Sequence, residues 1–167
     1  RYRKFARESR QGREEYRAEL REMITQLESV PSIVLWVPFN EGWGQFDAAD
    51  ACRIIRSVDE SRPIDHASGW HDQKIGDIQS LHVYFRPYKL GRAVILSEFG
   101  GYNLRLEGHC WNDVNYGYKG FSDREALWQA YRKLMEEQIL PAIPRGLCAA
   151  IYTQLTDVED ELNGIMT

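Results

Sequence analysis

Helical and extended hydrophobic periods alternate along this chain, and that alternation restricts the fold more than any other feature. Over residues 14–28 apolar side chains recur at helical spacing, and Pro31 ends the segment. The run that follows, "SIVLWV", is apolar at five successive positions, as in a strand covered on both faces by helices. This order predicts an α/β fold in which right-handed crossovers join parallel strands.

The same alternation continues to the end of the chain. We expect a second helix over residues 46–59, and a third that begins at a capping box, residues 122–125, and ends at Pro141. Four further strands are predicted, at "RPIDHAS", "IQSLHVYF", "RAVILSEF" and "GLCAAIYTQL". The Gly-, Asn- and Tyr-rich segment 100–121 is too long for a plain connection, which favours a functional loop. Trp36 and Trp128 are expected in the core.

Composition and charge narrow the classes of partner. The 167 residues are 43% hydrophobic and 28% charged, as in ordinary globular domains, and carry a net charge of −4. Outside the first residues there is no basic block, which argues against nucleic acid and anionic membranes as partners. Residues 1–13 are basic and polar, lack the apolar core of a signal peptide, and are expected to be flexible or partly ordered.

Cysteine usage leaves the compartment open. The chain has three cysteines, an odd number without close spacing, which predicts neither a disulfide framework nor a zinc site. Cys52, on a predicted helix, and Cys148, in an apolar strand, are expected to act as small hydrophobic side chains. A reducing compartment fits this pattern, and a cytoplasmic, periplasmic or secreted location depends on what precedes the chain.

Polar side chains gather at the carboxyl ends of the predicted strands, where α/β barrels hold their active sites. Glu41 ends the first strand and Glu98 the fourth. Two carboxylates that face one cavity are what glycoside hydrolysis requires, since one protonates the leaving oxygen and the other attacks the sugar or activates water. Aromatic rings that are suited to stack on sugars follow nearby: Trp43, Trp70, Tyr84 and Trp111.

The chain resembles a known enzyme family over residues 14–167. Three segments carry the resemblance: "PSIVLWVPFNEGWGQF", "ILSEFGGY" and "YTQLTDVEDELNGIMT". Together they resemble the catalytic barrel of glycoside hydrolase family 2, the family of β-galactosidases and β-glucuronidases. The resemblance implies a partial (β/α)8 TIM barrel in which the five predicted strands are strands four to eight. Strands one to three and the preceding β-sandwich domains of the family are expected on a longer parent chain.

The resemblance also assigns roles. It implies a retaining double displacement without metal or cofactor, with Glu41 as acid/base, Glu98 as nucleophile, and their carboxyls roughly 5 Å apart. Asn40 is expected to bind the sugar 2-hydroxyl, Tyr84 to donate a hydrogen bond to the nucleophile, and His82 to line the pocket. The other predicted substrate-binding residues are Trp43, Trp70, Tyr152 and Gln154. A terminal β-galactoside is the first substrate expected.

Two other functions stay open on sequence alone. One is a non-catalytic carbohydrate-binding or assembly module, because fold does not determine function. The other is a metal-dependent barrel hydrolase with ligands among Asp65, His66, His71 and His82, although no H-x-H or H-E-x-x-H spacing is present. The 167-residue piece by itself is expected to hydrolyse sugars weakly or not at all, and its open sheet edges invite self-association.

Overall fold

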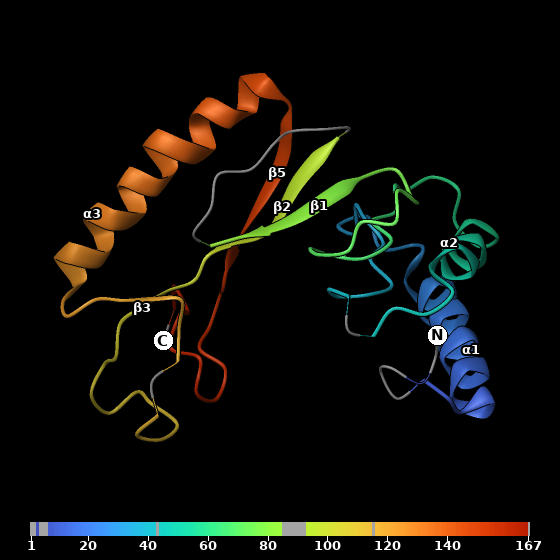
Figure 1. The fold of residues 1–167 in the computed structure, drawn as a ribbon, viewed down its shortest axis with the longest axis horizontal. Coiled ribbons are helices and arrows are strands. Elements are labelled where there is room, and N and C mark those ends of the chain that lie inside the picture. The colour runs from blue at the N-terminus through green and yellow to red at the C-terminus, as the bar shows by residue number, and fades with distance from the viewer. Residues whose placement is uncertain (1–2, 4–6, 43, 85–92, 115, 167) are drawn as a thin grey trace. The chain divides into compact units, whose positions relative to one another are not determined.

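The computed structural model describes residue 3 and residues 7–42, 44–84, 93–114 and 116–166 (Figure 1). The chain divides into two compact units, Arg1–Ser80 and Leu81–Thr167. Among the described residues, no helix combines the length and apolar character needed to cross a membrane.

The first unit begins with helix α1, Arg10–Leu27. Ser9 caps it, since its hydroxyl accepts a hydrogen bond from the Gly12 amide at 3.0 Å. The helix therefore starts four residues before the predicted residue 14, because the polar opening turns carry no hydrophobic signal. The predicted apolar stripe of this helix is confirmed at Leu20 and Ile24, which are buried.

Two extended segments of the first unit pair in parallel, as the sequence predicts. Trp36 forms a parallel bridge with Ile64, and Asn40 with Ser68. The pairing is limited to such isolated bridges and does not form continuous strands. One expectation is wrong: Val34 is 72% exposed and Val37 41%, so the first segment is not covered on both faces. Helices α1 and α2 (Ala48–Arg56) pack against Trp36 and Phe39 instead.

An aromatic cluster joins α1 to the first extended segment. The Tyr16 ring stacks on Phe39 at a centroid distance of 5.3 Å and meets the edge of Phe46 at 5.1 Å. Its hydroxyl donates to the Pro38 carbonyl at 2.5 Å, and burial raises the pKa of Tyr16 to about 12. The phenol therefore stays neutral and fixes the backbone two residues before Asn40.

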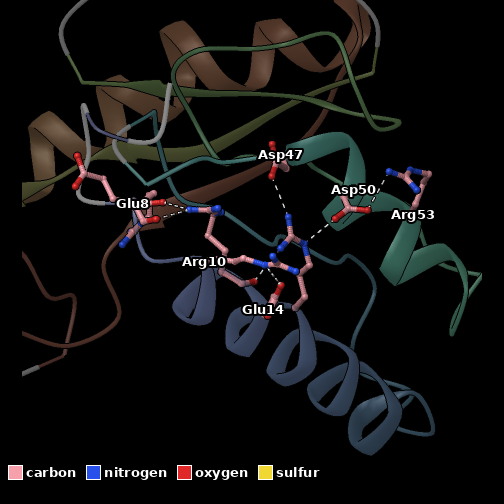
Figure 2. Close-up of polar contacts among 9 residues, drawn as sticks. Glu8, Arg10, Glu14, Asp47, Asp50 and Arg53 are labelled. Carbon is pink, nitrogen blue, oxygen red and sulfur yellow. Dashed lines mark hydrogen bonds and ion pairs between the residues drawn. The ribbon is translucent and has the colours of Figure 1, made fainter.

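Charged side chains join the two helices of this unit (Figure 2). Arg17 of α1 donates to Asp47 at 2.9 Å and to Asp50 at 2.7 Å, and Arg53 approaches Asp50 at 2.9 Å. Asp47 is the residue before α2 and has a left-handed backbone, with φ of 43°. The Arg17 guanidinium therefore holds the start of α2, directly after the segment that contains Glu41.

A buried carboxylate stabilises the opposite end of the extended segments. Asp59 accepts hydrogen bonds from the hydroxyl and amide of Ser61, from the Trp36 indole at 2.7 Å, and from Arg62 at 2.6 Å. These donors, the Ser61 hydroxyl foremost, hold the pKa of Asp59 well below its usual range. Trp36 is buried, as predicted, and its indole nitrogen has a hydrogen-bond acceptor in Asp59.

The second unit is built around a three-stranded sheet in the order β1-β2-β5 (Figure 1). The strands are β1, Gln79–Val83, β2, Val94–Gly100, and β5, Leu147–Thr153. Strands β2 and β5 are parallel, with Val94 opposite Leu147 and Phe99 opposite Tyr152. The predicted parallel α/β class is confirmed.

Strand β5 differs from the prediction in its burial. Leu147 is buried, but the next four residues, Cys148 to Ile151, are exposed. Cys148 is therefore not the buried small hydrophobic side chain that was expected, whereas Cys52 on α2 is buried. Sheet order explains the difference, because β5 lies at an edge of the described sheet.

The crossover between β2 and β5 contains α3, Arg124–Leu134. Its cap is Asp123, whose carboxylate accepts from the Ala126 amide at 2.8 Å, so the predicted cap at Ser122 is wrong by one residue. The chain continues through a π-helical turn, η2 (Met135–Ile139), and a 3-10 segment, η3 (Leu140–Arg145), which contains Pro141. Trp128 is 53% exposed and does not lie in the core.

Candidate active site

Glu98, near the end of β2, lies in contact with two aromatic side chains of the second unit. The Tyr84 hydroxyl donates to its Oε2 at 2.5 Å. Nδ1 of His82, on β1, lies 3.2 Å from the same oxygen, and the His82 side chain is fully buried. The Glu98 side chain retains 28% exposure. This carboxylate is therefore held by fixed neighbours while it stays accessible to a ligand.

Tyr84 is fixed on three sides within this unit. Its hydroxyl lies 3.3 Å from the Thr153 hydroxyl, and its ring stacks on Tyr118 at a centroid distance of 3.5 Å. Burial, followed by the hydrogen bond to Glu98, raises the pKa of Tyr84 far above its ordinary value. Because the phenol stays protonated, it donates to Glu98, and Thr153 then donates to the phenol oxygen.

Two glycines after Glu98 make room for these aromatic rings. Gly100 and Gly101 both have positive φ, 83° and 64°. A Cβ at Gly100 would lie 2.2 Å from the Tyr152 ring, and one at Gly101 would lie 2.3 Å from the Tyr118 ring. The two glycines of the "EFGG" motif are therefore required for steric reasons. Only glycine adopts a positive φ easily and leaves room for the neighbouring rings.

The long loop after β2 returns to this site. Strand β3, Tyr102–Asn103, pairs in parallel with β4, Lys119–Gly120. The Tyr118 amide donates to the Gly101 carbonyl at 3.1 Å, which places the Tyr118 ring on Tyr84. Sequence reasoning missed Tyr118 and Thr153 as site residues. The tyrosine-rich composition of the loop was the available signal for Tyr118.

Replacing Tyr84 by phenylalanine should lower kcat/KM for a glycoside about ten- to hundredfold. The reason is that a hydrogen bond to a charged group contributes about 1.5–3 kcal/mol. Steady-state kinetics of the full-length protein that contains this sequence measure the effect. Tyr131→Phe is the matched control, because the Tyr131 ring packs on Trp128 and Tyr152 in the same unit. Equal kinetics for the two variants would contradict a role for the Tyr84 hydroxyl.

Two predicted substrate contacts have partners within the fold. The Tyr152 hydroxyl accepts from the Tyr102 amide at 3.1 Å, its ring lies against Phe99 and Tyr131, and burial raises its pKa to about 12. The Gln154 amide donates to Asn163 at 2.7 Å. These contacts assign both side chains to packing and loop structure, and their role toward substrate stays a prediction.

The first unit carries Glu41 in an unusual backbone conformation. Glu41 has φ of 53°, in the left-handed region that non-glycine residues rarely adopt. Its amide donates to the Ser68 carbonyl at 2.6 Å, and its carbonyl accepts from the Gln45 side chain at 2.7 Å. Asn40 precedes it at the parallel bridge to Ser68. The carboxyl ends of two extended segments thus lie side by side, as predicted.

Two of the tryptophans that are predicted to stack on sugars are exposed. Trp70 is 47% exposed, and its carbonyl lies 3.5 Å from the Gln45 amide nitrogen. Trp111, in the long loop of the second unit, is 79% exposed. Trp43 lies outside the described residues. Trp70 and Trp111 are therefore exposed enough for stacking on a sugar, which stays a prediction for both.

Two of the three histidines considered as metal ligands, His66 and His71, have other neighbours in the first unit. His66 is buried, and its Nε2 accepts a hydrogen bond from the Gln73 amide at 3.2 Å. Asp65 is buried beside it and accepts from the Ala67 amide at 3.3 Å. His71 lies against Gly42, where a Cβ would come within 1.9 Å of its ring. These contacts give the three residues neighbours within the first unit, and His71 lies beside the segment that follows Glu41.

A parallel α/β arrangement with an acid, a tyrosine and a histidine at the carboxyl ends of its strands is typical of barrel enzymes. The family model "Glycosyl hydrolases family 2, TIM barrel domain" matches residues 2–102. The chain therefore belongs to this family, and the resemblance seen in the sequence is confirmed.

Comparison with solved structures supports the fold. A β-glucuronidase from an uncultured Clostridium species matches with a TM-score of 0.57 at 18% sequence identity. The match covers 91% of this chain and 32% of that chain, so the sequence spans about a third of the enzyme that it resembles. The search of curated proteins gives no match. At this identity the likeness supports a partial barrel, and the strands that it contains stay predicted as four to eight.

Proposed function

We propose that this chain supplies the acid/base and the nucleophile of a retaining glycoside hydrolase that cleaves terminal β-glycosidic bonds. The observation that carries the proposal is the Glu98 carboxylate, held by the Tyr84 hydroxyl at 2.5 Å and by His82 at 3.2 Å while remaining partly exposed. Family membership supports it, since the matched residues 2–102 include both Glu41 and Glu98.

In the first step Glu98 attacks the anomeric carbon while Glu41 protonates the departing glycosidic oxygen. The carbon–oxygen bond to the leaving group breaks, and an ester bond forms between the sugar and the Glu98 carboxylate. Tyr84 donates to the Glu98 oxygen that its hydroxyl contacts, so the other oxygen is the one available for attack. Two carboxyls roughly 5 Å apart are required for this sequence of steps.

In the second step Glu41, now deprotonated, removes a proton from water, and the resulting hydroxide displaces Glu98 from the sugar. Two inversions return the original configuration at the anomeric carbon. Tyr84 stays protonated throughout, because its pKa is raised by burial and by the Glu98 carboxylate. It therefore orients the nucleophile and does not act as a base.

The proposed substrates are β-galactosides first and β-glucuronides second. The motif "NEGWGQF" favours a β-galactosidase-like enzyme, and the structural relative is a β-glucuronidase. A panel of nitrophenyl β-glycosides distinguishes the two. Residues on the parent chain outside this sequence are expected to contribute to sugar choice, because this chain spans 32% of the relative's length.

Covalent trapping tests the proposed function. A 2-deoxy-2-fluoro-β-glycoside with a dinitrophenolate leaving group should form a stable ester with the full-length protein, because fluorine slows both steps and the leaving group speeds the first. Peptide mapping by mass spectrometry should then find the sugar on Glu98. A label on another residue, or turnover without any trapped ester, would overturn the assignment. Sugar binding without turnover or label would favour the non-catalytic module instead.

A further inference from the structure

We propose that Gln45 is a positioning residue for Glu41, and that it acts on the acid/base through the main chain. The inference rests on the proposed function, in which Glu41 delivers a proton to the leaving oxygen. A general acid must lie within hydrogen-bond reach of the atom that it protonates, so the direction of its backbone matters. All the contacts used below lie in the first unit.

The Glu41 backbone is in a conformation that its own side chain disfavours. With φ of 53° its Cβ crowds the following carbonyl, so the conformation persists only where neighbours hold it. One neighbour is the Ser68 carbonyl, which accepts from the Glu41 amide at 2.6 Å. The other is Gln45, whose Nε2 donates to the Glu41 carbonyl at 2.7 Å. The two hydrogen bonds hold both sides of the residue.

Gln45 is itself oriented by the loop that follows the second extended segment. Its Oε1 accepts from Nε2 of Gln73 at 2.6 Å. The Gln73 backbone is held in turn, because its amide donates to Nε2 of the buried His66 at 3.2 Å. The Gln45 amide therefore has one consistent orientation, with its nitrogen toward Glu41 and its oxygen toward Gln73.

Close packing gives the same segment little room to move. A Cβ at Gly42 would lie 1.9 Å from the His71 ring, so the backbone directly after Glu41 touches the loop that contains Gln73. Hydrogen bonds from Gln45 and the contact of Gly42 with His71 thus connect these two residues to one loop, residues 70–73. The arrangement explains why a glutamine follows four residues after the acid.

The test compares two classes of substrate, because only poor leaving groups need the proton of Glu41. Gln45→Leu in the full-length protein should lower kcat/KM for alkyl β-glycosides about fivefold to tenfold, the scale of one neutral hydrogen bond. For dinitrophenyl β-glycosides the change should stay below about twofold. A general folding defect would lower both values equally. Gln11→Leu is the matched control, since the Gln11 amide donates to Glu15 at 2.7 Å on the exposed face of α1.

A second variant tests the orientation of the amide without touching Gln45. In Gln73→Glu the new carboxylate accepts from the Gln45 nitrogen, so the amide turns and its oxygen faces the Glu41 carbonyl. The same loss, selective for alkyl leaving groups, should follow at this exposed position. Equal losses for both substrate classes, or none in either variant, would overturn the positioning role of Gln45.

A third variant separates the failure of this inference from failure of the proposed function. Glu41→Ala should lower kcat/KM for alkyl β-glycosides far more than for dinitrophenyl β-glycosides. The loss for the alkyl substrates should be much larger than in the Gln45 and Gln73 variants. If Glu41→Ala lacks that selectivity, the proposed acid/base assignment is wrong. If Glu41→Ala has it and the Gln45 and Gln73 variants do not, only the inference about positioning is wrong.

Discussion

Replacing Glu98 by glutamine should reduce kcat on the order of 10⁶-fold, the scale on which loss of the nucleophile acts in a covalent serine protease. Glutamine keeps the size of the side chain but cannot form the sugar ester. The Tyr84 hydroxyl, which donates to Glu98 at 2.5 Å, is able to donate to the amide oxygen of glutamine, so the fold of the second unit should be kept. Steady-state kinetics and circular dichroism of the full-length protein measure the two effects.

The matched control for this substitution is Glu137→Gln, on the exposed side of η2, where the carboxylate lies 3.9 Å from Lys133. Its kinetics should equal those of the wild type. A stereochemical measurement makes the assignment sharper. In Glu98→Ala, azide has room to attack from the side of the lost nucleophile, so the product should be a glycosyl azide of inverted configuration. Residual activity above about 1% of wild type in Glu98→Gln would contradict the nucleophile assignment.

The geometry around Glu98 shows what sequence reasoning predicts well. His82 and Tyr84 lie 16 and 14 residues before Glu98, on or just after β1, and the order β1-β2-β5 brings them to one carboxylate. That outcome follows from parallel strands whose carboxyl ends share one edge. Regular pairing fixes the relation between strand ends without any knowledge of the loops.

Contacts made by loops were not predictable in the same way. Tyr118 reaches Tyr84 because Gly100 and Gly101 turn the chain with positive φ and because β3 pairs with β4. The Gln45 side chain donates to the Glu41 carbonyl where Glu41 is in a left-handed conformation. Such turns depend on single backbone angles, for which hydrophobic periodicity carries no information.

A hydrophobic run in the sequence does not show that a strand is covered on both faces. Val34, Val37 and the middle of β5 are apolar yet exposed in the described chain. A run of β-branched and small residues shows which surface a strand is able to bury, but the covering element must exist elsewhere. This chain spans 32% of the length of the structural relative, so strands and helices of a parent barrel are our proposed cover.

Glu41→Gln should affect substrates according to their leaving groups. For alkyl β-glycosides, kcat/KM should fall between about 10² and 10⁴-fold, the usual contribution of general acid catalysis. For dinitrophenyl β-glycosides the fall should stay below about tenfold, because the departing phenolate needs no proton. The parameter kcat/KM reports the first chemical step, so slow hydrolysis of the sugar ester, which also needs Glu41, does not obscure the comparison.

The matched control for Glu41 is Glu60→Gln, at an exposed position of the same unit, which should leave both substrates unaffected. Azide supplies an independent readout in Glu41→Ala, since it needs no base to attack the sugar ester. It should restore turnover of the dinitrophenyl substrate and give a glycosyl azide of retained configuration, opposite to that expected from Glu98→Ala. In the proposed mechanism the two carboxylates act on opposite faces of one anomeric carbon, so this pair of opposite configurations is the expected result. Identical configurations from the two variants would contradict that mechanism.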